Sequence, residues 1–232
     1  MDEAFVGDAL AVRRITAYLS TLADAIRELR GILLSVREKC DPEVFYNEIR
    51  PWFRGVDSVP GEREWVFEGS EGVEELSGPS AGQSALIHAL DVFLGVDQYM
   101  EEGGGEPNFM KRMQAYMPRH HRAFLAHLAA SPRPLRAFVE NAADGEEDEV
   151  GQTSSSCALR EAYNDAVLAL KEFRDAHIQI VALYIVGPSR RGRREGECHE
   201  RRLRGTGGTQ LVRFLKGVRD RTEGAVLLQD AA

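Results

Sequence analysis

A long amphipathic helix, expected at about residues 158–186, is the feature that most constrains how this chain folds. Its apolar side chains recur at alternating steps of three and four residues, which places them on one helix face turned toward a core. That face consists of Leu159, Tyr163, Ala166, Leu170, Phe173, His177, Ile180 and Tyr184. Gly187 and Pro188 follow directly and are expected to end the helix.

His177 is the unusual member of this face. A titratable imidazole among apolar side chains needs a hydrogen-bond partner, or a bound group that uses its lone pair. A lone histidine in such a place is usually an ordinary core residue, so this helix alone leaves both interpretations open. Arg174 lies one turn earlier and close to the same face, and a buried arginine requires a carboxylate partner.

Helical patterns continue through the rest of the chain. Apolar residues with the same stepping predict a second long helix at about 8–39. A shorter helix is expected at about 42–50, and Pro51 should end or kink it. Ser80, with Gln83 at the spacing of a capping box, predicts the start of another helix.

Four further helices complete the predicted fold. They are expected at about 107–116, 119–130, 133–142 and 209–223. Thr209 is the expected N-cap of the last one. Only residues 64–68 (EWVFE) resemble a strand. The sequence therefore predicts an all-α fold, a helical bundle of long and short helices.

Composition bounds the class of protein. The 232 residues are 43% hydrophobic and 28% charged, with a mean hydropathy of -0.32, which is typical of one globular domain spanning 1–232. No apolar run approaches the roughly 18 residues of a membrane span, and the N-terminus lacks the basic segment of a secretory signal. An odd number of cysteines, three, favours a reducing compartment and hence the cytoplasm. The net charge of -8 argues against a nucleic-acid partner.

Two segments of opposite charge are expected to form mobile loops, at 143–157 and 188–204. The first holds five carboxylates within 144–149, and the second holds seven arginines within 190–204. The glycine-rich run 205–209 (GTGGT) could present backbone N–H groups to an anion or act as a hinge. It lacks the lysine of a P-loop, so a nucleotide site is not expected there.

Taken together, several short motifs resemble the large domain of the indoleamine 2,3-dioxygenase family. They occur in the family's order with similar spacing, and the resemblance covers nearly the whole chain. The motifs are FYNEIR at 45–50, SAGQS at 80–84, DVFLG at 91–95, QAYMP at 114–118, LREAY at 159–163, RDAHIQIV at 174–181 and GTGGT at 205–209.

This resemblance implies a haem b cofactor. It assigns His177 as the proximal ligand of the haem iron, with O₂ bound on the opposite side. Arg174 and Asp91 match the family's arginine and aspartate beside that ligand, and we expect them to form a buried pair next to His177. The bottom-up alternative for His177, a plain core histidine of a helical scaffold without a cofactor, stays open at this stage.

The resemblance also implies a substrate site. Phe45 would pack on the indole ring, and Arg50 would bind the carboxylate of L-tryptophan or a related indoleamine. Further walls would come from Ser80, Ala81, Thr206 and Gly207. Without the resemblance, Phe45 would be interpreted as a core residue and Arg50 as half of a surface ion pair.

The implied reaction inserts both atoms of O₂ across the indole C2–C3 bond and gives N-formylkynurenine, the first step of the kynurenine pathway. No side chain is assigned as a general base, and His88 is the second candidate for the role of His177. Family members carry a smaller N-terminal domain ahead of the first long helix, whereas here Met1 lies almost at that helix. An incomplete product, a truncated paralogue, or a chain whose distal side is covered by a partner chain would each account for this, and a non-catalytic haem-binding or interaction module is the alternative function.

Overall fold

The computed structural model describes residues 8–55, 68–69, 76–96, 109–131, 134–143, 152–191, 205–206 and 210–228. These residues form helices and connecting turns, with no β-strand among them, which confirms the predicted all-α fold. The α-helices are α2 (Ala9–Lys39), α3 (Pro42–Val44), α4 (Ala85–Phe93), α5 (Phe109–Gln114), α6 (Arg119–Ala129), α7 (Leu135–Ala143), α8 (Gln152–Val181), α9 (Gly187–Arg191) and α11 (Leu211–Gly224). Four single-turn segments join them: η1 (Phe45–Ile49) and η5 (Ala182–Val186) are π-helical, and η2 (Arg50–Phe53) and η3 (Ala81–Gln83) are 3₁₀.

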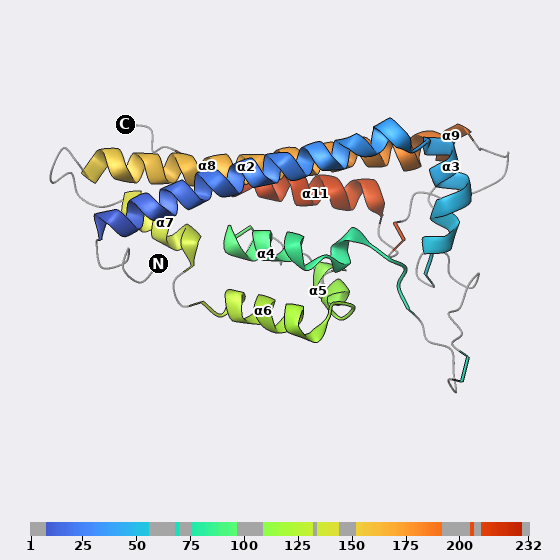
Figure 1. Ribbon diagram of the computed structural model, residues 1–232, viewed down its shortest axis with the longest axis horizontal. Coiled ribbons are helices and arrows are strands. Elements are labelled where there is room, and N and C mark those ends of the chain that lie inside the picture. The colour runs from blue at the N-terminus through green and yellow to red at the C-terminus, as the bar shows by residue number, and fades with distance from the viewer. Residues whose placement is uncertain are drawn as a thin grey trace.

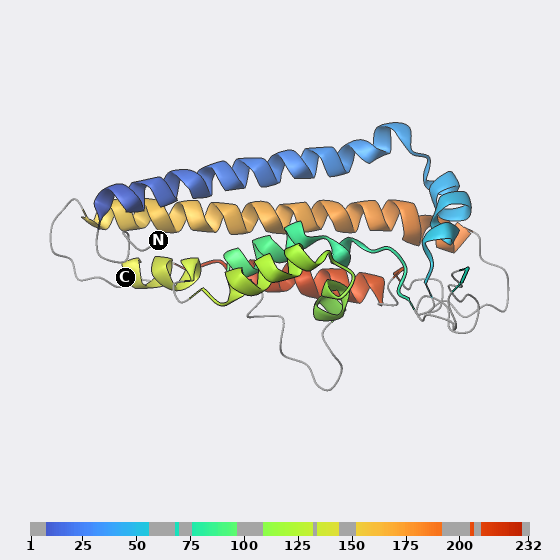
Figure 2. The ribbon, with the colours of Figure 1, turned by 60° about the horizontal axis from the view of Figure 1, so that its bottom comes forward.

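The two long helices form the frame of the molecule. α2 and α8 lie side by side over most of their length and run in the same direction, while α11 packs against α8 (Figure 1). Arg219 of α11 contacts Asp175, whereas Leu227, farther along the chain, bonds to Asn164, so α11 runs antiparallel to α8. Turned by 60°, the molecule shows α2, α8 and α11 stacked in that order, with α4 and α6 in front of α11 (Figure 2). In the part of the chain that the structure describes, no helix is long and apolar enough to cross a membrane.

One face of α8 packs in the hydrophobic core along its first half and borders a cavity near its end. Its N-terminal half is buried in the hydrophobic core, where α2, α4 and α7 contribute the other side chains. The completely buried core members include Leu19, Ile26, Leu94, Val139, Leu159, Tyr163 and Leu170. Phe173 and His177 of this face border a cavity instead, and farther along the chain Val181 and Ile185 do. The predicted stripe is therefore confirmed as a helix face, but only half of it is core.

Most predicted elements are present, with shifted ends. The first long helix is α2, with Asp8 as its N-cap. The capping box of Ser80 and Gln83 is formed, although it caps the 3₁₀ turn η3 and α4 begins only at Ala85. α11 begins at Leu211, and the side chain of Gln210, the residue before it, makes no capping bond. The strand-like residues 64–67 and Thr209, the expected cap, lie outside the described part of the chain.

Two expectations about helix ends and loops are corrected. Gly187 does not end the long helix: its φ of -59° and ψ of -59° are right-handed helical, and the chain continues through η5 into α9. Residues 152–157 of the segment expected as a loop at 143–157 belong to α8, and residues 188–191 of the one expected at 188–204 belong to α9. Residues 144–151 and 192–204 lie outside the described ranges.

Both π-helical segments end two residues before a proline. η1 ends at Ile49 before Pro51, and η5 ends at Val186 before Pro188. A proline inside a regular α-helix lacks an N–H and clashes with the carbonyl four residues earlier. The wider π turn relieves that clash, so the helix changes geometry instead of stopping. Pro188 therefore does not terminate the long helix as the sequence suggested, whereas at Pro51, which was expected to end or kink its helix, the geometry changes from π to 3₁₀ and the helix ends at Phe53.

Candidate functional site

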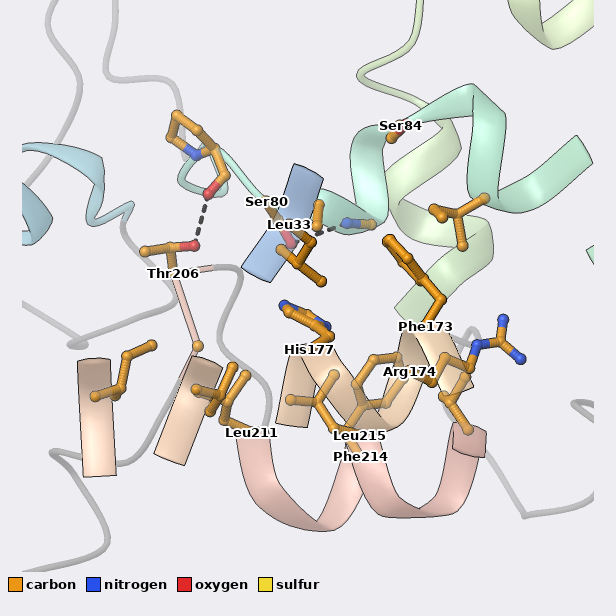
Figure 3. A pocket seen from close by; sticks show the side chains of 18 of the residues that line it. Leu33, Ser80, Ser84, Phe173, Arg174, His177, Thr206, Leu211, Phe214 and Leu215 are labelled. Carbon is orange, nitrogen blue, oxygen red and sulfur yellow. Dashed lines mark hydrogen bonds between the residues drawn. The ribbon is translucent and has the colours of Figure 1, made fainter. Parts of the chain in front are cut away.

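A cavity of about 630 Å³ lies between α8, α11, the C-terminal half of α2 and the η1–η2 and η3 turns (Figure 3). This volume falls within the roughly 300–1,000 Å³ of ligand pockets. Most of its walls are apolar. They are formed by Leu29, Ile32, Leu33, Phe45, Phe53, Pro79, Ala81, Leu86, Ile87, Phe109, Met110, Phe173, Val181, Ile185, Leu211, Phe214, Leu215 and Val218. Polar side chains are few: Arg50, Ser80, Ser84, Arg174, His177 and Thr206.

His177 projects from α8 into this cavity, between Leu33 and the leucines of α11 (Figure 3). None of the hydrogen bonds among the described residues involves its imidazole. Burial, and after it the positive charge of Arg174, lowers the pKa of His177 below its usual value of 6.5. The imidazole is therefore neutral near pH 7 and presents a lone pair.

Behind His177 lies the buried ion pair that the resemblance predicted. Arg174 donates from Nη2 to Oδ1 of Asp91 at 2.5 Å, and both side chains are nearly inaccessible, at 8% and 4% exposed. Nη1 of Arg174 donates to the hydroxyl of Thr222, which is completely buried and itself donates to Val218 O at 2.9 Å. The pair thus ties α4, α8 and α11 together one helical turn from His177. Thr222 was not recognised from the sequence, because a threonine on a helix carries no signal of its own.

His88 shows what an ordinary buried histidine looks like in the same fold. It is 5% exposed, and both ring nitrogens have partners: Nε2 lies 2.8 Å from Gly82 O, and Nδ1 lies 3.2 Å from the side-chain amide of Gln114. Its side chain does not line the cavity. Of the two candidate histidines, only His177 has the geometry of a ligand.

Arg50 and Phe45 border the same cavity, as the resemblance implied. Arg50 is only 4% exposed, and its guanidinium carbon lies 5.4 Å from the ring centre of Tyr46. Burial, the largest cause, lowers the pKa of Arg50, which means that the charged guanidinium is poorly solvated where it lies. An anion that enters the cavity would offset the free-energy cost of burying this charge. A carboxylate suits the site because the guanidinium can donate two parallel hydrogen bonds to it.

Ser80 and Thr206 line the cavity, but their hydroxyls already have structural roles. The Ser80 hydroxyl accepts from the Gly82 N–H at 3.2 Å as part of the capping box. The Thr206 hydroxyl donates to Pro79 O at 2.6 Å, the bond drawn in Figure 3, and Thr206 O accepts from the Gly78 N–H at 3.2 Å. Ala81 is a wall residue as expected, and Gly207 lies outside the described residues.

A close backbone crossing holds these wall segments in place. A Cβ at Gly78 would lie 2.1 Å from Phe53 O, and one at Gly55 would lie 2.1 Å from Gly78 N. Only glycine fits where these two segments cross. The carbonyl oxygen of Thr206 accepts a hydrogen bond from the Gly78 N–H at the same crossing. The end of η2, the residues before η3 and the 205–206 turn therefore meet at one edge of the cavity.

Much of the apolar wall could not be recognised from the sequence. Phe109 of α5 and Phe214 of α11 meet edge to face, with ring centres 5.0 Å apart at 73°, and both border the cavity. Tyr184, by contrast, was expected on the His177 face but lies away from the cavity, and Val181 and Ile185 line it instead. An apolar side chain that lines a cavity gives the same helical pattern as one that fills a core.

The residues around His177 fit a haem group on two observations of this structure. The imidazole of His177 is neutral and makes no hydrogen bond to the described residues, and a neutral histidine is a common proximal ligand of haem iron. The walls facing it are leucine, phenylalanine, valine and isoleucine side chains, as a large apolar macrocycle requires. Arg174 and Asp91 supply the buried polar support that orients such a ligand.

Comparison with known proteins points the same way. The family model described as indoleamine 2,3-dioxygenase matches residues 1–225. The chain is 35% identical to indoleamine 2,3-dioxygenase 2 of Mus musculus over 219 residues, covering 92% of this chain and 50% of the mouse protein. It is 36% identical to indoleamine 2,3-dioxygenase of Saccharomyces cerevisiae over 234 residues, covering 88% of this chain and 49% of the yeast protein. A 6-hydroxytryptophan 2,3-dioxygenase of Fusarium equiseti is 32% identical, with coverage of 90% and 51%. The chain spans about half the length of the curated relatives it matches.

Proposed function

Because this chain belongs to the indoleamine 2,3-dioxygenase family, we propose that it binds haem b through His177 and opens the indole ring of L-tryptophan or a related indoleamine to N-formylkynurenine. The observation that carries the proposal is the neutral imidazole of His177, which makes no hydrogen bond to described residues and projects into an apolar cavity with Arg50 on its wall. The relatives' names support the reaction class, and the Fusarium relative shows that ring-substituted tryptophans belong to the range of substrates to test.

Each part of the cavity has a task in this proposal. His177 holds the haem iron, and the Asp91–Arg174 pair fixes the helix turn from which His177 projects. Arg50 binds the carboxylate of the amino acid, and Phe45 packs on its indole ring. When bound, haem supplies the activation of O₂, which is chemistry that no side chain here provides.

The protein's remaining contribution is orientation and the exclusion of water. The leucine and phenylalanine walls keep the indole ring in a dry environment, with the C2–C3 bond held in one place by two contacts at opposite ends of the substrate. Both oxygen atoms enter the product, so no proton has to be stored on a side chain.

Arg50→Ala tests the substrate half of the proposal. We expect the haem-loaded variant to keep its haem spectrum and to bind L-tryptophan about ten- to hundredfold more weakly, because a charge-assisted hydrogen bond to the carboxylate is lost. Titration of the Soret region with L-tryptophan measures this. Arg13→Ala, on an exposed position of α2, is the matched control and should bind tryptophan like the unmodified chain. Equal affinity of the Arg50 and Arg13 variants would contradict the role of Arg50.

The alternative is a non-catalytic haem-binding or interaction module, and the chain's coverage of about half of its relatives motivates it. We expect the 232-residue chain to bind haem better than it oxidises tryptophan. Formation of N-formylkynurenine under reducing conditions separates the two functions. Robust turnover by the chain alone would establish the enzyme. Haem binding without turnover would favour the module, whether light scattering shows the chain to be a monomer or a dimer. A partner chain that covers the distal side would then stay a prediction.

A further inference from the structure

Tyr184 lies behind Phe45 and outside the cavity. The two π-helical segments, η1 and η5, face each other, and the rings of Phe45 and Tyr184 meet edge to face with centres 5.7 Å apart at 86°. Phe45 lines the cavity, whereas Tyr184 is 3% exposed and does not. An edge-to-face contact of this kind fixes the direction of a ring better than aliphatic packing does.

The hydroxyl of Tyr184 is bound to the end of α2. It donates to Cys40 O at 2.7 Å, with Val36 O at 3.3 Å as a second acceptor. Cys40 is the C-cap of α2, where the chain turns through Asp41 into α3 and then η1. Tyr184 therefore holds both sides of this turn: its ring contacts Phe45, and its hydroxyl holds the backbone that leads to Phe45.

Phe45 and Arg50 are joined by a single backbone bond. The N–H of Arg50 donates to Phe45 O, which is the i to i+5 bond of the π turn. A shift of Phe45 is therefore passed directly to Arg50. Because the two residues are five apart, they reach the same cavity only while this widened turn is kept.

We propose that Tyr184 is a positioning residue of the substrate site, which sets the place of Phe45 and, through the π turn, of Arg50. The inference rests on the proposed function for the identity of the substrate, but the positioning itself is a property of the fold. The two can be tested apart, because amide exchange in the haem-free chain reports on the π turn and tryptophan titration of the haem-loaded chain reports on the site.

Tyr184→Phe is the main variant, since it removes the hydroxyl and keeps the ring. Tyr163→Phe is the matched control: it lies on α8, which η5 continues, it is completely buried, and its hydroxyl also donates to a backbone carbonyl, Leu94 O at 2.6 Å. We expect hydrogen–deuterium exchange at 45–50 to become faster in Tyr184→Phe and to stay unchanged in Tyr163→Phe. The haem spectrum should be the same in both variants.

Tryptophan binding provides the second measurement. We expect Tyr184→Phe to weaken it about three- to tenfold, as the loss of one buried hydrogen bond suggests, and Tyr163→Phe to leave it unchanged. Phe45→Leu should weaken it as well, and adding Tyr184→Phe to that variant should have a smaller effect than Tyr184→Phe has alone, since part of the effect of the hydroxyl reaches the substrate through the ring of Phe45. Unchanged exchange at 45–50 in Tyr184→Phe, or equal effects of the two tyrosine variants, would overturn the inference. Faster exchange at 45–50 in a chain that binds no tryptophan would instead support the positioning and contradict the proposed function.

Discussion

His177→Ala is expected to abolish the Soret band of the haem-loaded chain, or to leave weak uptake without a defined ligand. The substitution removes the imidazole that projects into the cavity, and the described residues that line the cavity include no second histidine. Absorbance at equimolar haem measures the loss. Imidazole added to the solution should restore part of the band, because the space left by the side chain can accept it.

Two other histidines serve as controls for this variant. His127 is exposed on α6, and His88 has both ring nitrogens in hydrogen bonds. Their alanine variants should keep the haem spectrum, although His88→Ala should lower stability because it removes the partner of the Gln114 amide. A normal histidine-ligated spectrum in His177→Ala, or its loss in His88→Ala with the fold intact, would show that the ligand was assigned to the wrong residue.

The second large effect concerns the buried pair behind His177. Asp91→Asn and Arg174→Met should each lower the free energy of unfolding by about 3–5 kcal/mol, because each leaves the other charge buried without its partner. Urea denaturation of the haem-free chain measures this. The double variant should lower the free energy of unfolding by less than the sum of the two single variants, since it removes both charges.

An exposed ion pair between the same kinds of residue gives the matched control. Arg27 of α2 contacts Asp165 of α8, with side chains 39% and 44% exposed. Asp165→Asn should change the free energy of unfolding by about 0–1 kcal/mol, because solvent screens such a pair. If Asp91→Asn lowered the free energy of unfolding as little as Asp165→Asn does, the pair beside His177 would not have the structural role assigned to it.

The sequence predicted the helices well because their signal is repetitive. The stepping of apolar residues along α2 and α8 spans many turns, so local irregularities do not hide it. The buried pair of Asp91 and Arg174 was also predicted, but through the family's motifs and not through the pattern, since the two residues are far apart in the chain.

What the sequence did not predict depends on single turns and on shape. Nothing in a three-and-four pattern reveals that a helix widens for one turn before Pro51 or Pro188, so Gly187 was taken for a stop. The residues that line the cavity after His177 along α8 and η5 are Val181 and Ile185, each four residues farther along, and not the Ile180 and Tyr184 of the expected face. Phe214 was expected only as part of a helix. The pattern of apolar residues predicts which side chains face inward, but it does not predict where the packed helices leave a space between them.

The origin of the cavity walls has a consequence for how the protein acquires a ligand during its synthesis. Leu33 and Phe45 come from the first part of the chain, His177 from much later, and Phe214 and Val218 from α11, the last described helix. A ribosome that has made everything up to Gln210 has produced the proposed iron ligand but not the wall that closes the cavity on that side. Such contacts between distant parts of a chain form late in folding. Loading of the cavity therefore requires α11 to have docked, and its yield depends on that docking occurring before the exposed apolar walls bind another partner.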